Sequence, residues 1–416
     1  KVGQLPKGFR VGSVFFRYTP EELPASEAKM FVTVIDVEDA PTKSVAGVFT
    51  SNALAGAPVM VCREILEGGE EVRGIVANNK VANVGAATGK EDAKRVMDCV
   101  AKFETRWRGT PRKARQEGDD RGVFLPSSTG VIGWRLPVDV MVDKLEKELV
   151  MFNERFVGGL AAARAIMTTD RYPKVAAFTL ANGARIVGVA KGAGMIEPKM
   201  GTMLSYVMTD ADIERDELQK ALTDAVAQTF NRISVDGDES TSDMVLALSS
   251  NRVENETDLA SFREGLTKVC AELAHHVVRN GEGTNHVIRL TVEGTEDESF
   301  LNDLARFVVN GPLLKTSIAG NDPNVGRLAA RLGQFLSSRN RKDLLPTARI
   351  SVGGVLVFQD GSLSWDKDKE TLVKEHYLAA QLNDPDIGLP GKDAGFDYPP
   401  HPRCVDLAID FSSPAA

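Results

Sequence analysis

Residues 191–210 read KGAGMIEPKMGTMLSYVMTD, and the interpretation of the chain starts from this stretch. The stretch contains three glycines, at 192, 194 and 201, and then turns apolar, as expected of a loop that leads into a buried strand. The loop has neither the GxGxxG nor the GxxxxGK(S/T) pattern, so a nucleotide site is a poor interpretation. The pair Gly201-Thr202 indicates hydroxyl chemistry instead, because glycine permits the strained turn that brings a threonine hydroxyl to the preceding carbonyl.

Attack of the Thr202 hydroxyl on the Gly201 carbonyl, followed by hydrolysis of the ester, would make Thr202 a new N-terminus. A free α-amine has a reference pKa of about 7.7–8.0, so part of it is neutral near physiological pH. That amine could take the proton of its own hydroxyl, which is the N-terminal-threonine form of nucleophile-plus-base catalysis. A Gly-Thr pair alone is equally compatible with an ordinary turn, so its spacing does not decide between the two.

Strands and helices are predicted on both sides of this loop. Two β-branched runs flank Asn182-Gly183, a strong hairpin signal, and Gly353-Gly354 marks a second hairpin. A helix is predicted over residues 213–230, and a second one after Thr257 as its N-cap. The strands are expected at residues 31–37, 174–180, 185–190, 287–292 and 349–358, and the second helix carries an apolar stripe from Leu259 to Val277. This order predicts an α+β fold of layered, largely antiparallel sheets packed against helices.

Length and composition narrow the function classes. A chain of 416 residues predicts two or three lobes, and its net charge of −8 argues against a nucleic-acid partner. No apolar run approaches the roughly 18 residues of a membrane span. Four scattered cysteines and five histidines without ligand spacing predict reduced thiols and no metal site, in the cytoplasm or, in a eukaryote, in a mitochondrial or plastid matrix. A polar stretch at residues 106–120 is expected to be an exposed loop.

Six strings occur in the order that they have in one enzyme family. Residues 191–204 resemble the cleavage region of the ornithine acetyltransferases, also called bifunctional glutamate N-acetyltransferases, with Gly201 where that family usually has alanine. The other strings are STGVIG at residues 128–133, AIMTTD at 165–170, SVDGDESTSD at 234–243, GEG at 281–283 and GNDPNVGR at 320–327. The resemblance therefore extends over about residues 48–333.

The resemblance implies a fold, a processing event and a set of site residues. Self-cleavage between Gly201 and Thr202 would give an α chain of residues 1–201 and a β chain of residues 202–416, the latter with a smaller C-terminal lobe, assembled as α2β2. Thr202 would be the nucleophile, and Thr129 and Gly130 would form the oxyanion hole. The residues implied to contact the amino-acid substrate are Thr168, Lys191, Thr202 and Glu282. A lysine suits a substrate carboxylate and a glutamate suits an ammonium group.

The implied reaction is transfer of an acetyl group from N-acetylornithine to glutamate through an acetyl-threonine intermediate, in arginine biosynthesis. No cofactor is implied, although acetyl-CoA could serve as a second donor. Three departures from the family pattern stand out: residues 78–89 match only in part, Thr284-Asn285-His286 replaces the usual ATK, and no asparagine follows Asn383. The last of these keeps alternatives open. The alternatives are an N-terminal-threonine amidohydrolase or aminopeptidase, a paralogue with another amino-acid substrate, and an uncleaved, non-catalytic relative.

Overall fold

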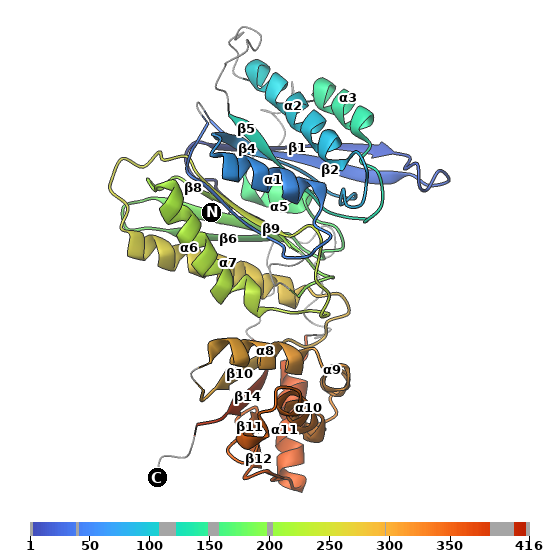
Figure 1. Cartoon of the computed structure of the whole chain (residues 1–416), viewed down its shortest axis with the longest axis vertical. Helices are drawn as coiled ribbons and strands as arrows, with labels where there is room; N and C mark the ends of the chain where they lie inside the picture. Colours follow the sequence, from blue (N-terminus) through green and yellow to red (C-terminus); the bar gives the residue numbers. More distant parts are fainter. Residues whose placement is uncertain are drawn as a thin grey trace. The chain divides into compact units, whose positions relative to one another are not determined.

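The computed structural model describes residues 3–38, 41–107, 122–148, 158–197, 203–295, 297–382 and 403–412. The chain divides into two compact units, Lys1–Asn280 and Gly281–Ala416 (Figure 1). This boundary follows packing, whereas the one predicted at Gly201–Thr202 is a covalent boundary inside the first unit. Both Gly201 and Thr202 lie outside the described residues.

Two sheets form the centre of the first unit. The first sheet has the order β1-β2-β4-β5, with only its last pair parallel, and the second has the order β3-β9-β8-β7-β6, with only β8 and β9 parallel. Their strands are β1 (Phe9–Tyr18), β2 (Ala28–Val37), β3 (Val45–Phe49), β4 (Val72–Asn78), β5 (Val123–Ser128), β6 (Lys174–Thr179), β7 (Arg185–Lys191), β8 (Leu204–Thr209) and β9 (Met244–Ser249).

Successive side chains on the strands of the second sheet point alternately into two hydrophobic cores, one on each face of the sheet. Val187, Val189 and Tyr206 belong to the core shared with the first sheet, whereas Ile186 and Val207 belong to a separate core formed with two helices. Because successive side chains of a strand point to opposite faces, one sheet can serve two cores. The layers thus run from helices to the first sheet, the second sheet and helices again (Figure 1).

Six α-helices are described in the first unit. Helices α2 and α3 pack on each other and on the first sheet, α1 packs on β5 and β3, and α5 packs on β1 and β7. Helices α6 and α7 cover the outer face of the second sheet. Their bounds are α1 (Ala57–Gly68), α2 (Gly89–Trp107), α3 (Val138–Glu148), α5 (Gly159–Ala165), α6 (Arg215–Gln228) and α7 (Leu259–Arg279), and a 3-10 turn spans Phe230–Arg232.

The second unit is a five-stranded sheet of order β10-β14-β11-β12-β13 with its own helices and core. Only β10 and β14 are parallel among its described strands. Its elements are β10 (Ile288–Glu293), α8 (Glu298–Val309), α9 (Pro312–Ala319), α10 (Val325–Ser338), a 3-10 turn (Lys342–Leu344), β11 (Arg349–Val352), β12 (Val355–Gln359), β13 (Ser362–Leu363), α11 (Lys367–Ala380) and β14 (Val405–Asp410).

The predicted α+β class with largely antiparallel sheets is confirmed, and so are both hairpins and both helices. One detail is wrong: α7 is capped by Asp258, whose carboxylate accepts from the amides of Ala260 and Ser261, and not by Thr257. Thr257 is buried and receives the Asn182 side chain, which removes it from the cap position.

Two further expectations concern the surface. Helix α2 extends to Trp107, so the predicted exposed loop does not begin at Arg106, and residues 108–121 lie outside the described residues. No helix in the described part of the chain is long and apolar enough to cross a membrane.

Candidate active site

The first part of the site is the turn that follows β5. The Asn78 side chain at the end of β4 accepts from the Ser128 hydroxyl (2.6 Å) and donates to the Val81 carbonyl (2.8 Å). The Asn78 carbonyl accepts from the Thr129 amide at 3.0 Å. These bonds between the ends of two parallel strands fix the backbone of Thr129, and they occupy its N–H group. Any catalytic donor from Thr129 must therefore be its hydroxyl.

Position 130 in this turn accepts only glycine. Its φ is +133°, a conformation that side chains with a Cβ rarely adopt. A Cβ at this position would lie 2.1 Å from the carbonyl carbon of Lys80, well inside van der Waals contact. The glycine in the predicted oxyanion pair is thus required by backbone geometry.

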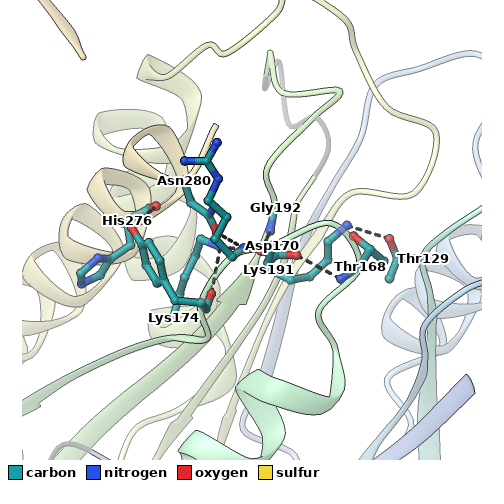
Figure 2. A network of polar contacts seen from close by, with 10 residues as sticks. Thr129, Thr168, Asp170, Lys174, Lys191, Gly192, His276 and Asn280 are labelled. Atoms are coloured by element: carbon teal, nitrogen blue, oxygen red, sulfur yellow. Dashed lines mark hydrogen bonds and ion pairs between the residues drawn. The ribbon is translucent and has the colours of Figure 1, made fainter. Parts of the chain in front are cut away.

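Lys191, the last residue of β7, reaches across to this turn. Its Nζ donates to Thr129 Oγ1 at 2.9 Å, and both residues are buried, at 4% and 6% exposure (Figure 2). Lysine has donors only, so the Thr129 oxygen must act as acceptor in this bond. The hydroxyl hydrogen of Thr129 is then directed away from Lys191 and can be donated to another acceptor. Two of the predicted site residues are therefore in direct contact, and Lys191 determines that the Thr129 oxygen accepts a hydrogen bond.

Thr168 joins the same network through Asp170. The Asp170 carboxylate accepts from the Thr168 amide (3.1 Å) and from the Gly192 amide (2.8 Å), and it forms an ion pair with Lys174 (Figure 2). Gly192 is the residue after Lys191. The Thr168 side chain itself is exposed, as a residue that meets a ligand should be.

Lys174, the first residue of β6, extends the network to the end of α7. Its Nζ donates to Asn280 Oδ1 at 2.6 Å, and the same oxygen accepts from the Arg171 amide at 3.2 Å. Burial alone would raise the pKa of Asp170, but the ammonium groups of Lys174 and Lys191 and the Gly192 amide outweigh burial and hold that pKa below its usual range. The carboxylate is therefore ionised at neutral pH.

Asp236 and the start of β9 hold the two flanks of the predicted cleavage segment. Asp236 accepts from the amides of Met195 (2.7 Å) and Ile196 (2.9 Å), on the N-terminal side. On the other side, the Met203 carbonyl accepts from the Met244 amide at 3.2 Å. The Asp238 amide also donates to Asp236 at 3.1 Å, so this acidic stretch is a hydrogen-bonded turn. Within the described residues, no group of His, Cys, Asp or Glu side chains has the geometry of a metal site.

Glu282 belongs to the second unit. It lies in a turn closed by the bond from the Thr284 amide to the Gly281 carbonyl (3.1 Å), and its side chain is exposed. The GNDPN motif is a turn: Asn321 has a φ of +53°, and the Asp322 amide donates to the Ser317 carbonyl at 2.8 Å.

Comparison with known proteins decides the family. The family model described as "ArgJ family" matches residues 26–386. A curated relative from Nitratidesulfovibrio vulgaris, named "Arginine biosynthesis bifunctional protein ArgJ", is 38% identical over 89% of this chain and 89% of its own length. The chain belongs to the ArgJ family.

Two other similar proteins carry different names. A curated ArgJ relative from Methanopyrus kandleri, named "Glutamate N-acetyltransferase", is 37% identical over 79% of this chain and 83% of its own length. A solved structure of ornithine acetyltransferase complexed with ornithine, from Mycobacterium tuberculosis, is 28% identical, with a TM-score of 0.36, and covers 49% of this chain and 97% of that chain.

Asp170, Lys174 and Asn280 carried no assigned role in the sequence. Asp170 and Lys174 are four residues apart around a proline, and Lys174 begins an otherwise apolar strand. A charge at the start of a buried strand was the available signal, because such a charge needs a partner. Asn280 gave no signal, since its partners come from segments more than 100 residues away.

Proposed function

We propose that this chain transfers an acetyl group from N-acetylornithine to glutamate, with Thr202 as the nucleophile. Membership of the ArgJ family supports the reaction class. The observation that carries the site assignment is the buried hydrogen bond from Lys191 to the Thr129 hydroxyl. It provides an oriented O–H donor beside a fixed positive charge, which suits a carboxylate-bearing substrate and a developing oxyanion.

The proposed reaction has two half-reactions that balance. The Thr202 hydroxyl attacks the acetyl carbonyl of N-acetylornithine, and its proton passes through the Thr202 α-amine to the departing amine of ornithine as the amide C–N bond breaks. The glutamate amine then attacks the acetyl ester, loses its proton to the same base, and returns the Thr202 oxygen as a hydroxyl. Thr129 and Gly130 would stabilise the oxyanion in both steps, and Thr168 and Lys191 would hold the amino acid. A contact from Glu282 stays a prediction of the family resemblance.

Self-cleavage between Gly201 and Thr202 is part of the proposal, because an acylated threonine nitrogen cannot act as a base. The strands on either side support two chains that stay together after cleavage. Lys191 of β7 and Leu204 of β8 are register partners in one antiparallel pair, so a cut between them leaves the sheet intact. We further propose an α2β2 assembly, no metal or organic cofactor, and acetyl-CoA as a second donor to be tested.

The first experiment is an intact-mass spectrum of the purified protein and of Thr202→Ala under denaturing conditions. Two fragments that meet at Gly201/Thr202 in the natural sequence, and one uncut mass in the variant, are expected. Transfer of labelled acetyl from N-acetylornithine to glutamate is then measured against release of free acetate. Cleavage with acetate as the main product would favour the amidohydrolase alternative, and an uncut, inactive chain would refute the proposal.

A further inference from the structure

The carboxylate of Asp170 bonds to two segments that carry proposed substrate contacts. One bond comes from the amide of Thr168 itself, and the other comes from Gly192, the residue that follows Lys191 (Figure 2). A single side chain thus sets the separation between the loop after α5 and the end of β7. Since the Asp170 side chain is completely buried, water does not compete for these bonds.

Lys174 is the counter-ion that stabilises this buried carboxylate. It is also completely buried, and its Nζ bonds both to Asp170 and to Asn280 at the end of α7. Its Nζ lies 5.2 Å from the centre of the Tyr172 ring, and the Tyr172 hydroxyl donates to the His276 carbonyl at 3.1 Å. The pair is therefore anchored on α7 and cannot shift independently of that helix.

We propose that Asp170 is a positioning residue for the amino-acid subsite, which it acts on through the backbone of Thr168 and of Gly192, with Lys174 as its charge partner. This inference rests on the proposed function, because the subsite is that of the proposed transfer. In this role Asp170 would act through the two backbone amides and not by contact with the substrate. Its effect is geometric, and a displacement of about 1 Å in a positioning group can cost about 100-fold in rate.

A buried ion pair could also be purely structural, so the test separates the two roles with a double-variant cycle. Asp170→Asn alone leaves the Lys174 charge buried without its carboxylate, which destabilises the fold. Asp170→Asn combined with Lys174→Met removes both charges and should restore most of the lost thermal stability. It does not restore positioning, because an amide has one acceptor atom where the carboxylate has two, and its NH2 group faces one of the two backbone amides.

The assay measures kcat and KM for N-acetylornithine and for glutamate, counted per chain cleaved at Gly201/Thr202. Loss of folded protein lowers the number of active sites and leaves KM unchanged, whereas a displaced subsite raises KM. We expect the double variant to melt close to the natural protein, with KM raised about 10-fold or more and kcat/KM lowered by about 100-fold.

Asp36→Asn is the matched control. Asp36 is likewise a completely buried carboxylate, paired with Arg73 at 3.1 Å and with Arg10 at 2.7 Å. It is the register partner of Gly74, near the opposite end of β4 from Asn78 and the site. This control should lose stability and keep its KM. A double variant that is stable and has the KM of the natural protein would overturn the role of Asp170 while leaving the proposed function standing. A natural protein that transfers no acetyl group would refute the proposed function and, with it, this role.

Discussion

Replacement of Thr129 by valine tests the proposed oxyanion donor most directly. The side chains have nearly the same shape, so the change removes the hydroxyl and little else. The Thr129 amide keeps its bond to the Asn78 carbonyl, and the bond between Ser128 and Asn78 is untouched, so the turn keeps its backbone. What is lost is the O–H donor and the acceptor for Lys191 Nζ.

The two losses have different sizes and different readouts. Removal of one preorganised oxyanion donor typically lowers kcat by about 100- to 1,000-fold, or about 2.7–4 kcal/mol. KM should change little, because the oxyanion exists only in the transition state. Loss of a charged, buried hydrogen bond should lower the free energy of unfolding by about 1.5–3 kcal/mol. Thr129→Ser retains the hydroxyl and should recover most of both.

Acetyl transfer from N-acetylornithine to glutamate provides the activity, and chemical denaturation provides the stability. Each kcat is normalised to the fraction of chains cleaved at Gly201/Thr202, so a processing defect is not mistaken for a catalytic one. A cleaved valine variant with a kcat within about threefold of the natural protein would refute the assignment of Thr129, given the expected loss of at least about 100-fold. An equally large loss in the serine variant, which keeps the hydroxyl, would show that loss of the hydroxyl alone does not explain the effect.

Three further predictions concern the surroundings of the site and the second unit. Gly130→Ala forces a Cβ to within 2.1 Å of the Lys80 carbonyl carbon at a φ of +133°, so it should cost about 3 kcal/mol or more of stability and abolish transfer; a melting temperature close to that of the natural protein would contradict this. Tyr206→Phe removes the 2.7 Å bond from its hydroxyl to Ser127 that joins the two sheets, and denaturation should show a loss of about 0.5–1.5 kcal/mol. Burial lowers the pKa of His286, so the stability that it contributes is present above its unfolded pKa and is lost as pH falls through the lower folded pKa. Hydrogen-exchange protection factors in the second unit, corrected for the intrinsic exchange rate at each pH, should fall below about pH 6.5, and in His286→Gln that fall should be absent.

Local signals in the sequence determined much of the first unit. The Asn182-Gly183 pair predicted the β6–β7 hairpin because its backbone twist matches that of paired strands, and the stripe from Leu259 to Val277 predicted α7. Both depend on residues close together in the chain. The strings at residues 128–133 and 165–170 likewise indicated where the site residues lie, through resemblance and not through geometry.

The tertiary structure alone decided how those residues meet. Lys191 and Thr129 are 62 positions apart, and their hydrogen bond exists because β5 and β7 end near each other in facing sheets. The network from Asp170 to Asn280 spans more than 100 positions. Neither residue, taken alone in the sequence, indicates that it belongs to a polar network. Periodicity reports which face of an element is buried, but it does not report which buried polar atoms face one another. That pairing depends on how the layers pack, and in this protein it determines the position and the polarity of the candidate active site.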